Sequence, residues 1–193
     1  MKSIPFLALI ILLASCGVQH RFTSKEAAAA DTSYIYTLPY PKGVSHLLIQ
    51  GYNSKLSHRG RIMLDFKMDK GSSITAARAG VVIRAIDSFS KGGFNKKYLG
   101  KANQITIKHD DGSQAMYAHL QKDGALVKVG DTVRVGQLIA KSGSVGYSAF
   151  PHLHFVVWGP TPRGRAQLPT RFYTKKGIQY LRPGCWHRQT RQF

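Results

Sequence analysis

The chain has 193 residues, which is the length of one ordinary domain and is enough to bury a core without disulfide bonds. Because 43% of the residues are hydrophobic and 10% are aromatic, the composition excludes a chain that is disordered over most of its length. Lys and Arg number 28 against 9 Asp and Glu, for a net charge of +19, so we expect an anionic partner: nucleic acid, a membrane surface or an acidic polymer.

The scarcity of acids and cysteines excludes several kinds of site. Glu26 is the only glutamate, which excludes His-Glu-x-x-His zinc proteases and two-glutamate glycosidases. Cys16 and Cys185 are the only cysteines, which excludes a multi-thiolate zinc finger and a disulfide scaffold. Cys185 and His187 offer only two metal ligands, so we interpret that region as a structural tail.

The N-terminal segment has the pattern of an export signal. Lys2 precedes an apolar run at 4–14 that is too short to span a bilayer, which takes about 20 residues. The run ends in Leu-Ala-Ser-Cys, which resembles a bacterial lipobox with Cys16 as the acylated first residue; the alternative is an ordinary secretory signal. Removing residues 1–15 leaves a charge of 27 − 9 = +18. Gly17 is not the aspartate of an inner-membrane retention signal, which favours an outer-membrane lipoprotein facing the periplasm.

The rest of the chain has a β pattern. We expect a signal peptide over 1–15, a flexible tether over 16–33 and a single domain over 34–193, with its core at 46–160 and a basic C-terminal extension. Short apolar runs recur between glycines, and no stretch has a sustained helical period. These runs predict strands around residues 47–49, 81–83, 105–108, 114–119, 138–140 and 155–158. Asp111-Gly112 between two runs predicts a hairpin.

Three further segments lie between or beyond these runs. Residues 87–102 form a long Lys- and Gly-rich connection, which is often functional or mobile in a compact domain. The related sequences at 128–133 and 134–139 predict a pair of tight turns. No acid follows Asp131, whereas ten Lys or Arg occur from Arg134 onward, which fits either a solvated basic surface or a face that binds an anionic matrix.

Histidines at the ends of predicted strands indicate a metal site. His152 and His154 lie on one face of a strand because side chains alternate, and Leu153 then points into the core. A lone His-x-His pattern is a weak signal, but His119 closes another predicted strand.

A second pair of residues adds to this set: His58 and Asp65 flank a turn at Arg59-Gly60. Three neutral or anionic ligands with one open position are typical of catalytic zinc, and the other two histidines can transfer protons where no glutamate is available.

These motifs in this order resemble the lysostaphin-type (LytM-like) zinc endopeptidases of bacterial cell walls. The similarity covers about residues 51–158 and rests on His…Asp, Tyr-Ala-His-Leu at 117–120 and Pro-His-Leu-His-Phe at 151–155. It implies a mostly β fold of the duplicated hybrid motif type, an antiparallel sheet with loops walling a zinc groove. The loop 87–102 and the turns at 144–150 are the candidates for these walls.

The resemblance also implies roles for individual residues. His58, Asp65 and His154 correspond to the ligands of one zinc ion, and His119 and His152 to catalytic histidines that do not bind the metal. Six residues separate His58 from Asp65, where the compact family pattern has three, and this leaves Asp69 as the fallback ligand. Tyr52 either supplies a hydroxyl to the oxyanion or is a core or wall residue, and His46 and His109 have no partner motif.

The resulting functional hypothesis is a zinc-dependent peptidoglycan endopeptidase that hydrolyses peptide cross-links. Its partners are peptidoglycan, the membrane through a lipid anchor at Cys16, and a regulatory envelope protein. The alternative is a non-catalytic LytM-like envelope factor that binds peptidoglycan and activates an amidase, but all five candidate residues are retained. A nucleic-acid binder has the right charge, yet the chain has an export signal and no recognisable nucleic-acid motif. Which bond is cut, and which of His119 and His152 is the general base, stay open.

Overall fold

The computed structural model describes residues 35–192. The predicted signal peptide, the predicted lipidation site Cys16 and the whole of the predicted tether lie outside the described residues. Within the described part, no helix has the length and apolar character needed to cross a membrane. The helical content there is a single 3-10 turn, η1 (Lys96–Tyr98).

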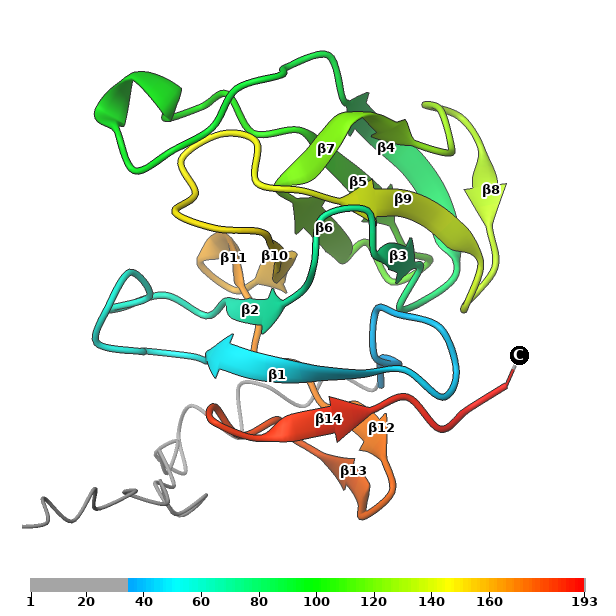
Figure 1. Cartoon of the computed structure of the whole chain (residues 1–193). Helices are drawn as coiled ribbons and strands as arrows, with labels where there is room; N and C mark the ends of the chain where they lie inside the picture. The colour runs from blue at the N-terminus through cyan, green and yellow to red at the C-terminus, as the bar shows by residue number, and fades with distance from the viewer. Residues whose placement is uncertain (1–34, 193) are drawn as a thin grey trace, which may run out of the picture.

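A nine-stranded sheet forms the body of the molecule (Figure 1). Its strands, in spatial order, are β14 (Trp186–Arg188), β1 (Ser45–Gln50), β2 (Leu64–Lys67), β10 (His152–Thr161), β6 (Gln114–Ala118), β5 (Gln104–Lys108), β4 (Gly80–Ile86) and β8 (Thr132–Val133), with β11 (Gly164–Gln167) paired to β10. All of these strand pairs are antiparallel. The expected mostly β, antiparallel fold is therefore confirmed.

Two smaller sheets complete the fold. One contains β3 (Ser73–Thr75), β9 (Leu138–Ser142) and β7 (Leu120–Ala125), and it lies over the β4–β6 part of the large sheet (Figure 1). The other is the hairpin of β12 (Phe172–Thr174) and β13 (Gly177–Gln179). The buried residues of β3 and β9 belong to the same hydrophobic cluster as those of β5, β6 and β10. The core therefore lies between the two layers.

The predicted turns occur where the sequence places them. Asp111-Gly112 connects β5 to β6, and the N–H of Gly112, at φ 79°, donates to the carbonyl of His109. The two related segments make matching turns, in which the N–H of Asp131 donates to Lys128 and that of Gln137 to Arg134. In each turn the later side chain accepts a hydrogen bond back from the earlier backbone N–H.

The C-terminal segment packs against the first strand. β14 pairs with β1 in register, with His187 opposite His46, and so covers an edge that would otherwise expose unpaired backbone groups. Phe172 and Leu181 are buried in the common core. His46 packs edge-on against Tyr40, with 4.8 Å between ring centroids, which is a structural role.

A buried histidine is expected to make the fold sensitive to acid. His109 is 3% exposed, its Nδ1–H donates to the carbonyl of Ala79, and its Nε2 has no hydrogen-bond partner among the described residues. Burial, with a smaller effect of the nearby Arg78 charge, lowers the pKa of His109 from its usual value. Below a pH of about 6.5 the unfolded chain therefore takes up a proton that the folded chain resists.

We expect the free energy of unfolding to fall as the pH drops from 7.5 to 5.5. In His109→Phe the fall is expected to be shallower, although the variant is less stable at pH 7.5 because Ala79 loses its donor. Urea unfolding at both pH values measures this. A pH dependence identical to that of the wild type in His109→Phe would contradict the assignment.

Candidate metal centre and groove

The centre of the candidate site is built by two neighbouring strands. Asp65 of β2 lies directly opposite His154 of β10 in the antiparallel register. Side chains two apart on a strand share a face, so His152 lies on the same side as His154. Leu153 between them is fully buried on the opposite face, as the sequence predicts. The strand pairing thus brings together residues that are 89 positions apart in the chain.

His58 reaches the same centre from a turn. The N–H of Arg61 donates to the carbonyl of His58, and Gly60, at φ 67°, lies in the left-handed region that favours glycine. The Nδ1–H of His58 donates to the carbonyl of Gly51 at 3.1 Å. Its Nε2 therefore faces inward, 3.1 Å from Oδ2 of Asp65.

These three side chains form a compact donor set. The ligand atoms of His58, Asp65 and His154 all lie within 4.8 Å of one another. Nδ1 of His154 is 2.8 Å from Oδ1 of Asp65, on the other oxygen from the one that faces His58. An imidazole lone pair this close to a carboxylate oxygen is repelled unless a proton or a cation lies between them. Two imidazoles and one carboxylate fit zinc, which takes N and O ligands and keeps an open position when catalytic.

The charges of this cluster are set by mutual contacts. Burial opposes ionisation of Asp65, but the hydrogen bonds from His154 and His58 outweigh it and hold the pKa of Asp65 well below its usual value. Burial also lowers the pKa of His58, and the contact with Asp65 reverses that effect so that its pKa is raised. Nε2 of Gln50, on the neighbouring β1, donates to Oδ2 of Asp65 at 2.8 Å and fixes the carboxylate plane.

The two remaining histidines stand beside the donor set. Their ring centroids are 4.7 Å apart, and the His119 ring is 5.8 Å from that of His154. The predicted strand ends one residue earlier than expected, at Ala118, because His119 has a left-handed φ of 65°. The Nδ1–H of His119 donates to Val145, and that of His152 to Phe150, both at 2.9 Å. In each ring, Nε2 therefore remains available to groups that bind in the site.

Burial favours the neutral form of both of these histidines. Burial, together with the nearby His152 and His154, lowers the pKa of His119 to about 3. Burial also lowers the pKa of His152, against the opposing effect of Asp65. Nε2 of His152 is 3.8 Å from Oδ1 of Asp65. At neutral pH the site therefore offers two imidazole nitrogens that are able to accept a proton.

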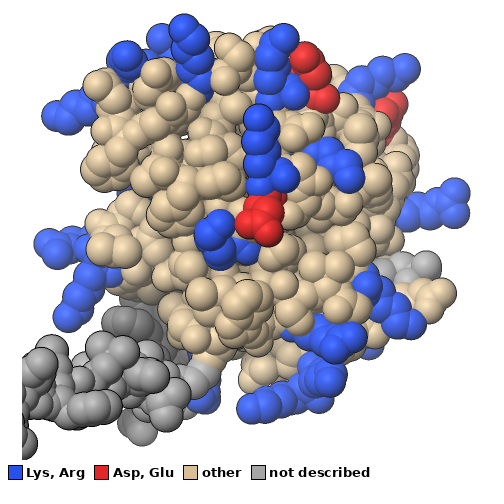
Figure 2. Space-filling view, in the orientation of Figure 1, with Lys and Arg blue, Asp and Glu red and all other residues tan. Residues whose placement is uncertain are grey.

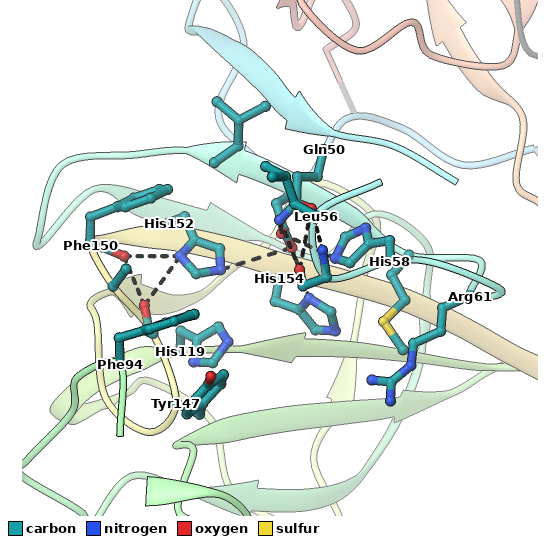
Figure 3. A pocket seen from close by; sticks show the side chains of 16 residues that line it. Gln50, Leu56, His58, Arg61, Phe94, His119, Tyr147, Phe150, His152 and His154 are labelled. Carbon is teal, nitrogen blue, oxygen red and sulfur yellow. Dashed lines mark hydrogen bonds and ion pairs between the residues drawn. The ribbon is translucent and has the colours of Figure 1, made fainter. Parts of the chain in front are cut away.

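The five side chains line a groove of about 510 Å³ (Figure 3). Both predicted wall segments contribute to it: Phe94 comes from the loop 87–102, and Tyr147 to Phe150 come from the turns at 144–150. The rings of Phe94 and Tyr147 stack with 4.9 Å between centroids. Phe94 is 77% exposed, so an apolar surface is presented to whatever enters the groove.

Backbone contacts tie the two walls together. Gly92 pairs with Gly146, and the N–H of Gly146 donates to the carbonyl of Lys91. A Cβ at Gly92 would overlap the backbone oxygen of Ser144, so this close approach requires glycine. The amide of the buried Asn103 holds the base of the loop by bonding to Phe89 on both its N–H and its carbonyl.

Other candidates lie away from the cluster. The side chain of Asp69, the fallback ligand, is fully exposed beside Lys67 and does not line the groove. Tyr52 is 8% exposed and is bonded through its hydroxyl to both the N–H and the carbonyl of Thr170, so it is a core residue and not an oxyanion donor. Gln50 and Arg61 both line the groove but were not identified as site residues from the sequence. The only sequence signal for Gln50 was that Gln50-Gly51-Tyr52 belongs to the same family resemblance.

Comparison with known proteins gives a consistent result. The sequence pattern of peptidase family M23 matches residues 57–168. Glycyl-glycine endopeptidase ALE-1 of Staphylococcus capitis is 37% identical over 136 residues, 68% of this chain and 33% of that protein. Peptidoglycan DD-endopeptidase ShyB of Vibrio cholerae is 31% identical over 131 residues, 63% of this chain and 28% of that protein.

A solved structure has the same fold. The catalytic domain of the prophage-encoded M23 protein EnpA from Enterococcus faecalis superposes with a TM-score of 0.51 at 25% identity, over 67% of this chain and 92% of that one. The chain therefore matches nearly all of this catalytic domain but only about a third of the length of the two curated relatives.

Proposed function

Because the chain belongs to peptidase family M23, we propose that it is a zinc-dependent peptidoglycan endopeptidase that hydrolyses peptide cross-links in the bacterial cell wall. The observation that carries the proposal is the cluster of His58, Asp65 and His154 on the floor of an open groove, with two neutral histidines beside it. The names of the relatives support a peptide-bond hydrolase of the cell wall.

His58, Asp65 and His154 would hold the metal. When bound there, zinc supplies a Lewis acid that polarises a peptide carbonyl and makes a water molecule more acidic. Gln50 keeps the Asp65 carboxylate in place, and the carbonyl of Gly51 fixes the tautomer of His58. These contacts give the ligand set its orientation before any substrate arrives.

His119 and His152 would move protons. Each is anchored through Nδ1 to a backbone carbonyl, so its Nε2 is the atom that faces the reacting groups. One of them takes the proton of the attacking water at Nε2. The other, in the form in which Nε2 is also protonated, stabilises the developing oxyanion and passes that proton to the leaving amine, and proton transfer between the two adjacent rings then restores both. Their adjacency, with 4.7 Å between ring centroids, puts both within reach of one peptide bond.

The surface charge suits a polymer that bears carboxylates. Lys and Arg are spread over the face in Figure 2 and far outnumber Asp and Glu there. Attraction of this kind concentrates the protein on an anionic matrix and weakens with added salt. We place the protein in the cell envelope, as a lipoprotein anchored through Cys16 to the outer membrane, facing the periplasm and controlled by an envelope partner.

Digestion of purified peptidoglycan tests the function. A soluble form beginning at Gly17 is expected to release muropeptide monomers from cross-linked dimers, and mass spectrometry identifies the bond that is cut. A chelated sample controls for the metal. A folded, zinc-loaded protein that releases no products would contradict the hydrolase and favour the non-catalytic amidase activator.

A further inference from the structure

The groove has two chemically different ends. Phe94 and Phe150 lie at one end, and Arg61 lies at the other, with the metal-ligating cluster between them (Figure 3). A substrate that crosses the cluster therefore meets an apolar surface on one side of its scissile bond and a guanidinium on the other.

Arg61 carries a positive charge in the groove that no acidic side chain pairs with among the described residues. Among the described lining residues it is the only Lys or Arg, and Asp65 is the only acid. Asp65 is already surrounded by three histidines and Gln50. No ion pair among the described residues involves Arg61. Its guanidinium is thus available to a ligand, whereas the groove's only carboxylate is not.

The backbone of Arg61 is held in a fixed position. Its N–H donates to His58 at 2.9 Å, its carbonyl accepts from Asn53 at 3.0 Å, and the next N–H is bound by the side chain of Gln167. Since Arg61 lies only three residues from a candidate metal ligand, these bonds fix its backbone relative to the metal-ligating cluster. A guanidinium forms two parallel hydrogen bonds with a carboxylate, which gives both charge and directional selectivity.

We propose that Arg61 forms a subsite for a free carboxylate beside the scissile bond, so that the substrates are cross-links bearing such a carboxylate and not uncharged glycine bridges. This inference rests on the proposed function and names its substrate class. It separates the two bonds named by the relatives, because a glycyl-glycine bridge has no side carboxylate for Arg61 to bind.

Matched substrates test the subsite. The purified full chain is given a D-alanyl-diaminopimelate cross-linked dimer whose α-carboxylate beside the scissile bond is either free or amidated, and also pentaglycine. We expect the wild type to prefer the free carboxylate about tenfold in kcat/KM, mainly through KM. Arg61→Gln is expected to abolish the preference, Arg61→Glu to reverse it and Arg61→Lys to keep part of it. Arg59→Gln is the control, since Arg59 is exposed on the same turn and does not line the groove.

A binding measurement separates this inference from the proposed function. Fluorescence anisotropy with His119→Ala, alone and combined with Arg61→Gln, reports affinity for the two dimers without cleavage. Cleavage of both dimers at equal rates, unchanged in Arg61→Gln, would overturn the subsite and leave the hydrolase intact. Binding that prefers the carboxylate through Arg61, with no cleavage by the wild type, would overturn the hydrolase and retain the subsite. Absence of both would overturn both.

Discussion

Replacing His154 by alanine is expected to remove metal retention and peptidoglycan cleavage together. His154 supplies one of three ligand atoms that lie within 4.8 Å of one another, and its Nδ1 is 2.8 Å from Asp65. A two-ligand remnant holds zinc poorly, and loss of several kcal/mol of transition-state stabilisation lowers the cleavage rate about 10³-fold or more. Elemental analysis of the dialysed protein and muropeptide release measure the two effects.

The fold is expected to survive this change. His154 is only half-buried, and its strand neighbours Leu153 and Phe155 keep their core contacts. His187→Ala is the matched control, because His187 is also half-buried on a strand but lies outside the groove. Cleavage near the wild-type rate by a metal-free His154→Ala protein would contradict the zinc-dependent mechanism.

Local patterns were sufficient to predict most of the large sheet. β5 and β6 alternate apolar and polar side chains around an Asp-Gly turn, so residues that are close together in the chain predict both the strands and their connection. β12, β13 and β14 were not predicted as strands. Each is only three residues long, which is too short for a sequence pattern to develop. β14 forms by pairing with β1, more than 130 positions away in the chain, and β12 and β13 pair with each other.

The candidate site likewise contains residues that local patterns predict and residues that they do not. Its histidines and Asp65 were predicted because they occur in compact motifs at strand ends, although the register that sets Asp65 opposite His154 is a long-range property. Gln50 and Arg61 carry no such signal. Gln50 acts through a partner on the adjacent strand, and Arg61 acts through a turn whose position depends on Gly51, Asn53 and Gln167. Such residues are identified by contacts and not by spacing.

His119→Ala and His152→Ala are each expected to lower kcat by about 10²- to 10⁴-fold while zinc stays bound. Neither residue belongs to the compact donor set, and each presents Nε2 to the groove because its Nδ1–H is committed to a backbone carbonyl. Removing either ring deletes a proton carrier without deleting a ligand. This separates the two variants from His154→Ala, in which activity and metal are lost together.

The two histidines are expected to act as one unit. Because their rings are 4.7 Å apart and serve a single proton-transfer sequence, the double variant His119→Ala/His152→Ala is expected to be little slower than the slower single variant. Steady-state kinetics on a cross-linked dimer, with zinc content measured on the same samples, tests this. If one of the single variants kept the wild-type kcat, the histidine replaced in it would line the groove without taking part in proton transfer. The other histidine would then act as both general base and proton donor. A single imidazole can do this because the proton that it takes from water can be delivered to the leaving amine.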